Sequence, residues 1–267
     1  MIRFTIDTAK FRELLSRSLM YNSSVGIQRV AAIFSPNGVH IHDFSLGITG
    51  LDIRLAPSYF KTYEVDKETP VLLTETLFSK ISKFFNTSEM VDIDIGEIDG
   101  EEKIVVRGVN ENYEEPLLAV PKQEMLKFIQ SDIGYLPEVC FDEKKNFSEK
   151  VNFVGLLQVS ELQKFPETEL YAISTTEKGI VLGTLRDTGT YTRLAGIKDK
   201  KKFDQVTIHV LSDYFNRMSK NFAVDSDIWL IIGHFSPETN SGPDSIMFTQ
   251  YTPEISSTML LTTSNEE

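Results

Sequence analysis

The residues with the clearest potential for chemistry are two histidines and a few acidic side chains, and their spacing is that of strands. His40 and His42 alternate onto one face of a predicted strand, where two imidazoles could bind a metal ion. No third ligand is recognisable, so half-exposed strand histidines are the better interpretation. Asp92, Asp94 and Gly96 resemble a calcium loop only loosely, because the glycine stands one position early. We therefore expect no metal site and no cofactor.

No catalytic motif is recognisable either. The sequence contains no glycine-rich phosphate loop, no nucleophile elbow and no dinucleotide-binding Gly-x-Gly-x-x-Gly. Pro137 and Glu138, followed by residues 143–145, are faintly similar to a metal-dependent nuclease signature, but no supporting strand surrounds them. The single cysteine, Cys140, excludes an internal disulfide and a cysteine-only metal cluster. We therefore expect that the protein is not an enzyme.

Composition is that of an ordinary globular protein with an acidic surface. The 267 residues include 27 Lys and Arg against 39 Asp and Glu, a formal net charge of -12. This excess of acid argues against tight, sequence-independent binding of nucleic acid, because phosphates would be repelled. The sequence has no long uncharged apolar run, and its first residues indicate a strand, not a signal peptide. We expect an intracellular protein (cytoplasm or nucleoid, or nucleus in a eukaryote) without a membrane partner.

Two distant segments of the chain match each other in residue type. Residues 77–85, Leu-Phe-Ser-Lys-Ile-Ser-Lys-Phe-Phe, align with residues 214–222, Tyr-Phe-Asn-Arg-Met-Ser-Lys-Asn-Phe, at every position except the eighth. The match continues without a gap from residues 91–96 to residues 228–233. The spacing is half the chain, far longer than the period of about 20–50 residues of solenoid repeats. The sequence therefore predicts two tandem copies of one domain.

Each copy is predicted to combine a sheet with two helices, which is an α+β fold class. The first half has amphipathic helices over 8–21 and 76–85, and a strand hairpin across Pro36-Asn37-Gly38. The second half repeats the pattern with helices over 160–165 and 213–222. The predicted boundaries are an N-terminal domain over 1–120, a connector over 121–149 and a C-terminal domain over 150–267.

The predicted helices carry basic side chains on their solvent faces, in an otherwise acidic chain. Lys80 and Lys83 occupy this face in the first half, and Arg217 and Lys220 occupy matching positions in the second. Two interpretations stay open, a solvated face that balances charge and a surface that faces nucleic acid. In the second interpretation the facing residues are Lys10, Arg17, Lys80, Lys83, Lys164, Arg217 and Lys220.

The order of these elements, together with several short segments, resembles the DNA sliding clamps of the proliferating-cell-nuclear-antigen type. The similar segments are residues 34–41, Phe-Ser-Pro-Asn-Gly-Val-His-Ile, residues 51–55 and 60–66, and the two matching helices. The resemblance implies a ring, usually of three subunits, in which helices line the hole and sheets lie outside. It implies no catalysis. The basic helix residues would then face DNA and touch phosphates only.

A ring clamp would also explain the acidic composition. A tether that slides cannot bind phosphates tightly, because each contact adds a barrier to movement. A closed ring holds the duplex by topology, and a few lysines on its inner wall keep the local potential favourable. We therefore expect a processivity factor that encircles double-stranded DNA and tethers polymerase and other replication and repair proteins. The alternative is an interaction scaffold of the same fold, or one subunit of a mixed ring, without its own stable encirclement of DNA.

The resemblance further implies where protein partners bind. Strands over 113–120 of one subunit and 190–197 of the next would pair head to tail and close the ring, although Pro116 removes one donor. The interface residues are then Tyr113, Leu117, Leu118, Tyr191, Arg193 and Leu194. Client proteins of the family insert a short motif beneath the connector, and a clamp loader opens the ring. The corresponding partner-binding residues are Phe44, Ile48, Leu126, Phe128, Ile129, Pro243, Leu260 and Thr262.

Two features depart from the family pattern, and both lie where partners would dock. The connector is longer than usual, at about 25–30 residues. The segment after Asp43 has Leu46 where many members have an Asp-x-x-His motif. The apolar residues of the connector also have a structural interpretation, in which they pin the connector to the sheets. The details of partner binding therefore stay open.

Overall fold

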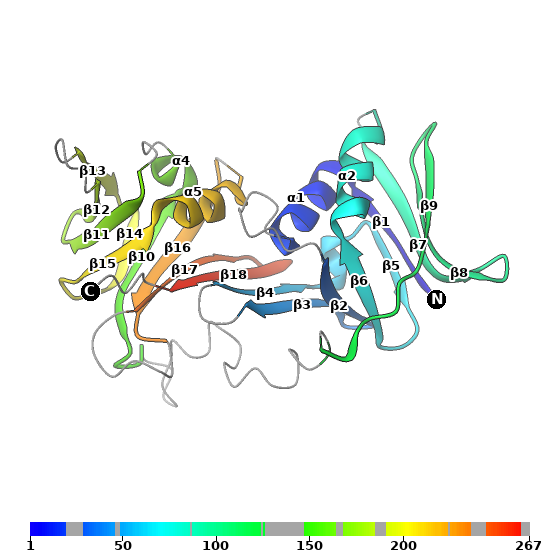
Figure 1. Ribbon diagram of the computed structural model, residues 1–267, viewed down its shortest axis with the longest axis horizontal. Helices are drawn as coiled ribbons and strands as arrows, with labels where there is room; N and C mark the ends of the chain where they lie inside the picture. Colours follow the sequence, from blue (N-terminus) through cyan, green and yellow to red (C-terminus); the bar gives the residue numbers. More distant parts are fainter. Residues whose placement is uncertain are drawn as a thin grey trace.

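Short strands dominate the structure, and the helices lie together on one side of them (Figure 1). The computed structural model describes residues 1–19, 29–45, 49–85, 87–123, 125, 147–163, 168–184, 191–223, 225–235 and 244–262. Within these stretches no helix is long and apolar enough to cross a membrane.

The same order of elements occurs twice along the chain. The first half contains β1 (Ile2–Asp7), α1 (Thr8–Ser18), β2 (Arg29–Ser35), β3 (Gly38–Ser45), β4 (Thr49–Leu55), β5 (Thr62–Val65), β6 (Thr69–Thr74), α2 (Glu75–Phe84), β7 (Met90–Ile98), β8 (Glu101–Arg107) and β9 (Asn112–Pro116). The second half contains β10 (Val151–Gln158), α4 (Val159–Leu162), β11 (Leu170–Thr176), β12 (Gly179–Thr184), β13 (Tyr191–Gly196), β14 (Asp199–Phe203), β15 (Thr207–Leu211), α5 (Ser212–Lys220), β16 (Asp227–Gly233), β17 (Ser245–Tyr251) and β18 (Ile255–Thr262). Each half is a strand, a helix, five strands, a helix and three strands, so the predicted duplication is confirmed.

One antiparallel sheet runs through both halves and joins them. A five-stranded sheet has the order β5-β1-β7-β8-β9, and a four-stranded sheet has the order β13-β12-β11-β15. The nine-stranded sheet has the order β14-β10-β16-β17-β18-β4-β3-β2-β6. Within it β18 of the second half pairs with β4 of the first, from Ile255 opposite Leu55 to Leu261 opposite Thr49. The halves are therefore held by backbone hydrogen bonds of one continuous sheet.

Equivalent glycines make the same tight hairpin in both halves. Gly38 begins β3 with a φ of +126°, and a Cβ atom there would lie 2.0 Å from the carbonyl oxygen of Leu55. Gly179 begins β12 with a φ of +152°, and its Cβ would lie 2.2 Å from the carbonyl oxygen of Ala195. Only glycine tolerates this backbone conformation and this close approach of a neighbouring strand. The hairpin predicted at residues 36–38 is therefore fixed by its glycine.

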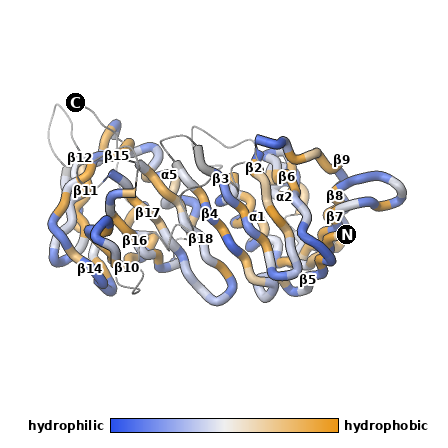
Figure 2. Tube along the Cα trace, turned by 90° about the horizontal axis from the view of Figure 1, so that it is seen from below, coloured by the Kyte–Doolittle hydropathy of each residue, from blue (hydrophilic) through white to orange (hydrophobic). Residues whose placement is uncertain are grey.

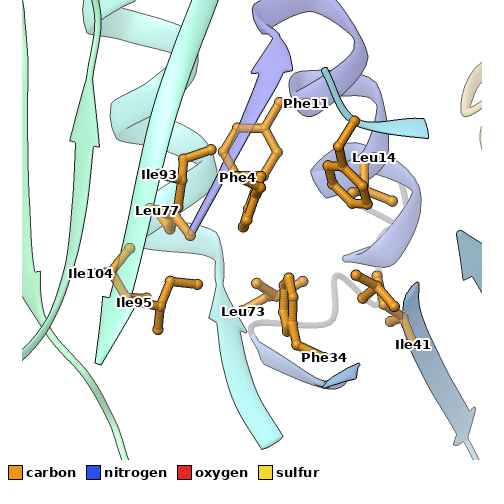
Figure 3. A pocket seen from close by; sticks show the side chains of 12 residues that line it. Phe4, Phe11, Leu14, Phe34, Ile41, Leu73, Leu77, Ile93, Ile95 and Ile104 are labelled. Carbon is orange, nitrogen blue, oxygen red and sulfur yellow. The ribbon is translucent and has the colours of Figure 1, made fainter. Parts of the chain in front are cut away.

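The helices pack their apolar faces onto the sheets, and Figure 3 shows the resulting core of the first half. Phe4 of β1 stacks with Phe34 of β2 at a ring-centroid distance of 5.7 Å and meets Phe11 of α1 edge-on at 6.1 Å. Leu77 of α2 and Ile93 of β7 line the same space (Figure 3). The cavity among these side chains measures about 10 Å³, which is the lower limit for a single water molecule, and its lining is apolar. It is a packing void and not a ligand site.

Three elements are shorter than the sequence pattern predicts. α1 ends at Ser18 instead of residue 21, and α4 spans only Val159–Leu162 instead of 160–165. β9 ends at Pro116 instead of continuing to residue 120. The backbone N–H of Leu117 still donates to the Glu102 oxygen of β8 at 2.9 Å, so the missing N–H of Pro116 lies on the side of β9 that faces away from β8.

Candidate nucleic-acid interface and partner-binding face

The sequence positions the polar faces of α1 and α2 away from the core. The side chain of Asp7 caps α1 by accepting a hydrogen bond from the Lys10 backbone N–H at 2.9 Å. Thr74 caps α2 in the same way, with a distance of 3.1 Å to the backbone nitrogen of Leu77. Such caps satisfy N–H groups that have no partner inside the helix. The buried apolar side chains of each helix share one face, and apart from Arg17 the charged side chains of the two helices lie off that face.

Four of the predicted DNA-facing residues lie on this layer of helices with their side chains described. Lys10 of α1 is 48% exposed, lies over the Tyr59 ring and is 3.5 Å from a carboxylate oxygen of Glu254. Lys80 is half-buried and Lys83 is exposed on α2, and Lys220 is exposed at the end of α5. Lys164 lies outside the described residues. Arg217 lies in α5, and its side chain lies outside what the structure describes.

Arg17 does not face solvent, so its prediction as a DNA-facing residue is wrong. Its exposed fraction is 2%, because the side chain lies between the two halves. Its Nε donates to the backbone oxygen of Asn221 at 2.8 Å, and its guanidinium lies 4.8 Å from the centroid of the Phe222 ring. Its Nη2 is paired with the carboxylate of Glu13 one turn earlier. Arg17 therefore ties α1 of the first half to the end of α5 in the second.

A groove of about 300 Å³ opens beside this junction. Its lining includes Arg12 and Ser16 of α1, Phe78 of α2, Lys220 of α5 and Phe222. Nε and Nη2 of Arg12 are buried and have no hydrogen-bond partner among the described residues. The periodicity of Arg12 places it at the edge of the apolar stripe, so only the structure shows that its donors reach this groove.

Two sheet edges carry the residues predicted for the subunit interface. β9 is an outer strand of the five-stranded sheet, and β13 is an outer strand of the four-stranded sheet. Near them Leu118 is 53% exposed and Leu194 is 46% exposed, which is high for leucine. β14, by contrast, is an outer strand whose first four residues are Asp199 and three consecutive lysines, and it is hydrophilic over this part (Figure 2). Charge of that kind protects an edge against pairing; β9 carries Glu114, Glu115 and Pro116, whereas β13 has a single charged residue, Arg193.

The polar residues at these edges form contacts within the chain. The hydroxyl of Tyr113 donates to the carboxylate of Glu115 at 2.7 Å. Burial raises the pKa of the Glu115 carboxyl, and the hydrogen bond from Tyr113 only partly opposes this rise. Arg193 of β13 pairs with Glu161 at 3.2 Å. Leu117 packs against the main core, and the side chain of Tyr191 lies outside the described set.

The predicted partner-binding residues lie mainly outside the described residues, but Leu260 belongs to a separate apolar cluster. This cluster is formed by Val151, Val154, Ile231, Phe235, Met247 and Leu260, with Phe147 and Trp229 packed against it. Leu260 stands opposite Met247 on one side and Gly50 on the other, and Gly50 stands opposite Phe44 of β3. Thr262 ends β18 and is half-buried. The side chain of Phe44 is not among those described, and Ile48, Leu126, Phe128, Ile129 and Pro243 lie outside the described residues.

A cluster of polar side chains lies on β3 and β4. Asp52 is buried, and its Oδ2 is 3.0 Å from Nε2 of His40 and 3.2 Å from Nδ1 of His42. Arg54 Nε donates to the other oxygen, Oδ1, at 3.3 Å. Burial alone would raise the pKa of the Asp52 carboxyl, but the hydrogen bonds from the two histidines, together with Arg54, hold it well below its usual range. Asp52 therefore remains a carboxylate at neutral pH.

Comparison with known proteins identifies the fold. No protein-family model matches the chain, and no curated protein matches it by sequence. In structure it is similar to PCNA from Thermococcus kodakaraensis, with a TM-score of 0.73, 11% identity, and coverage of 99% of this chain and 100% of that one. A. fulgidus PCNA bound to the C-terminal region of FEN-1 has a TM-score of 0.72 and 11% identity over 100% of both chains. The PCNA2–PCNA3 complex from Sulfolobus tokodaii has a TM-score of 0.71 and 15% identity, over 99% and 100%.

The chain therefore has the fold of the PCNA-type sliding clamps over its whole length. The resemblance predicted from short segments of the sequence is confirmed at the level of fold, and so is the α+β fold class. At identities of 11–15% this similarity concerns the fold alone.

Proposed function

We propose that the protein is a DNA sliding clamp, a ring of identical chains that encircles duplex DNA and tethers replication and repair proteins to it. The observation that carries the proposal is the repetition of one sheet junction. β18 and β4 pair inside the chain, and the two halves have the same order of elements. The counterpart of β18 in the first half is β9, and the counterpart of β4 in the second half is β13. Both counterparts are outer strands.

This repetition supports a defined pairing between subunits. If β9 joins β13 as β18 joins β4, Asn112 stands opposite Thr192, as Thr258 stands opposite Asp52 within the chain. A head-to-tail contact of this kind repeats and closes into a ring when the rotation fits. The helices occupy one side of every sheet and would all face the hole. In this register Glu111, directly before β9, would stand opposite Arg193 of β13, which favours this contact over a β9–β9 contact.

Contact with DNA is proposed for the helix layer. Lys10, Lys80, Lys83 and Lys220 would touch phosphates, and Arg217 and Lys164 are proposed on the basis of the sequence. Few phosphate contacts on an acidic chain suit sliding, because each tight contact would slow movement. We infer that the chain is not an enzyme, needs a loader to open the ring and works where chromosomal DNA is, inside the cell. Clients would bind through short peptides near Leu260 and the connector.

The oligomeric state tests the proposal first. Light scattering of the purified protein at micromolar concentration should give the mass of a trimer. In a Cys140→Ser background, Asn112→Cys with Thr192→Cys should form covalent rings on oxidation, because directly opposed strand residues lie within disulfide reach. The control pair Asn112→Cys with Thr207→Cys should not cross-link. A stable monomer would contradict the homomeric ring and support a scaffold or one subunit of a mixed ring.

Charge reversal tests the DNA-facing surface. A variant with Lys80, Lys83, Arg217 and Lys220 changed to Glu should load poorly onto DNA but stay folded, since changes on a solvent face cost little stability. A matched control reverses Lys61, Lys67, Lys178 and Lys200, which are exposed on turns and strands. Equal loading by the helix variant and the wild type would refute the assignment of this face.

A further inference from the structure

Three metal-ligating atoms converge on the β3–β4 hairpin. Nε2 of His40, Nδ1 of His42 and a carboxylate oxygen of Asp52 all lie within 4.8 Å of one another. Both histidines approach the same oxygen, Oδ2, at 3.0 and 3.2 Å. Tetrahedral zinc with bonds of about 2.0–2.1 Å separates its ligand atoms by about 3.3–3.4 Å. Two of the three distances are therefore already close to those of a metal site.

The sheet holds these residues rigidly. His42 stands directly opposite Asp52 in the β3–β4 register, and His40 follows on the same face because side chains alternate along a strand. The side chains of His42 and Asp52 are 5% and 4% exposed, whereas that of His40 is 34% exposed. Two ligands are thus fixed in the interior of the nine-stranded sheet, and the third borders solvent, from which an ion can enter.

We propose that His40, His42 and Asp52 bind a divalent transition-metal ion of the zinc class. Two imidazoles and one carboxylate are a donor set that zinc uses with a fourth position left open. Magnesium and calcium prefer oxygen ligands only, so imidazole nitrogens select against them. The fourth position would be filled by water or by a donor from a bound partner.

Arg54 orients the carboxylate of Asp52 and limits the affinity of the site for zinc. Its Nε bonds Oδ1 and leaves Oδ2 to the histidines. A residue that holds the outer oxygen of a ligating carboxylate is a common second partner around metal sites. Its positive charge opposes a dication, and its side chain is 45% exposed, so it can turn away. We therefore expect micromolar rather than nanomolar binding. Zinc binding competes with the metal-free state, in which the rings of His40 and His42 donate N–H hydrogen bonds to Asp52 where the ion would otherwise lie.

Calorimetric titration of the metal-free full chain with zinc chloride tests the proposal. The wild type should bind a single zinc ion per chain in the micromolar range, with each neutral imidazole carrying its proton on the ring nitrogen that points away from the ion. His40→Gln should weaken binding by roughly tenfold or more. This variant should fold, since His40 borders solvent, and thermal melting checks that it does. Titration with cobalt(II) should give the absorption spectrum of tetrahedral coordination in the wild type but not in His40→Gln.

His209→Gln is the matched control, because His209 is an exposed strand histidine outside the cluster. It should bind zinc as the wild type does. Absence of zinc binding by the wild type up to millimolar concentration would overturn the proposal. Equal zinc affinity in the wild type and a folded His40→Gln would do so as well, since the ion would then lie elsewhere.

Discussion

Replacing Arg17 by methionine should lower the free energy of unfolding by about 2–4 kcal/mol. The guanidinium donates to the backbone oxygen of Asn221 at 2.8 Å and lies 4.8 Å from the centroid of the Phe222 ring. A hydrogen bond from a charged donor contributes about 1.5–3 kcal/mol, and a desolvated cation–π contact up to about 2 kcal/mol. The stem of methionine retains part of the apolar packing, so the loss reports chiefly on the guanidinium.

Urea unfolding followed by the fluorescence of Trp229, the single tryptophan, measures this loss. The control is Lys220→Met, which removes an exposed cation from the neighbouring helix and should change stability by less than about 0.5 kcal/mol. At a temperature where both variants are folded, Arg17→Met should still load onto DNA. A loss below about 1 kcal/mol, or impaired loading by a fully folded Arg17→Met, would refute the reasoning that Arg17 joins the halves.

Three further outcomes are expected. Gly38→Ala should cost about 2 kcal/mol or more in thermal melting, because its Cβ would collide with the carbonyl of Leu55, whereas Gly196→Ala, which meets nothing within 4 Å, should change little. The pKa of Asp94 is lowered, since hydrogen bonds from Arg107 and Arg3 outweigh the effect of burial. The stability that the Asp94 carboxylate contributes is therefore present at neutral pH and lost as the pH falls below about 4, so Asp94→Asn should flatten the acid side of a stability–pH profile. Leu126→Ala combined with Ile129→Ala should weaken client-peptide binding by about 2 kcal/mol in calorimetry while the ring persists; unchanged binding would mean that the connector cluster only packs against the sheets.

Local patterns in the sequence account for most of the elements. The amphipathic period of residues 76–85 predicts α2 within one residue at each end, because its apolar face packs directly on the sheet. The match between residues 77–85 and 214–222 predicts the duplication, since equivalent helices fill equivalent sites. Periodicity fails at Arg17, however. It lies on the polar side of α1, and that side is covered by the second half of the molecule.

Local sequence patterns do not indicate which strands of the fold pair with each other. β18 pairs with β4, a strand about 200 residues earlier in the chain. Neither strand has a local sequence pattern that indicates which strand it pairs with. Asp52 was not expected beside the histidines because it lies on the next strand. Once β3 and β4 are known to pair, the antiparallel register places it opposite His42. The antiparallel register of a hairpin therefore indicates which residue of the next strand faces a pair of histidines.

The position of β18 in the nine-stranded sheet has a consequence for synthesis on the ribosome. β4 is made early, whereas its partner β18 is made after every other strand that the structure describes. Until then β4 exposes unpaired backbone groups, a state prone to pairing with other chains. Nascent chains on one messenger that meet in this state could exchange their β18 strands. Because the two halves are joined through β18 and β4, the chain is exposed to mispairing with other chains during the interval before β18 emerges.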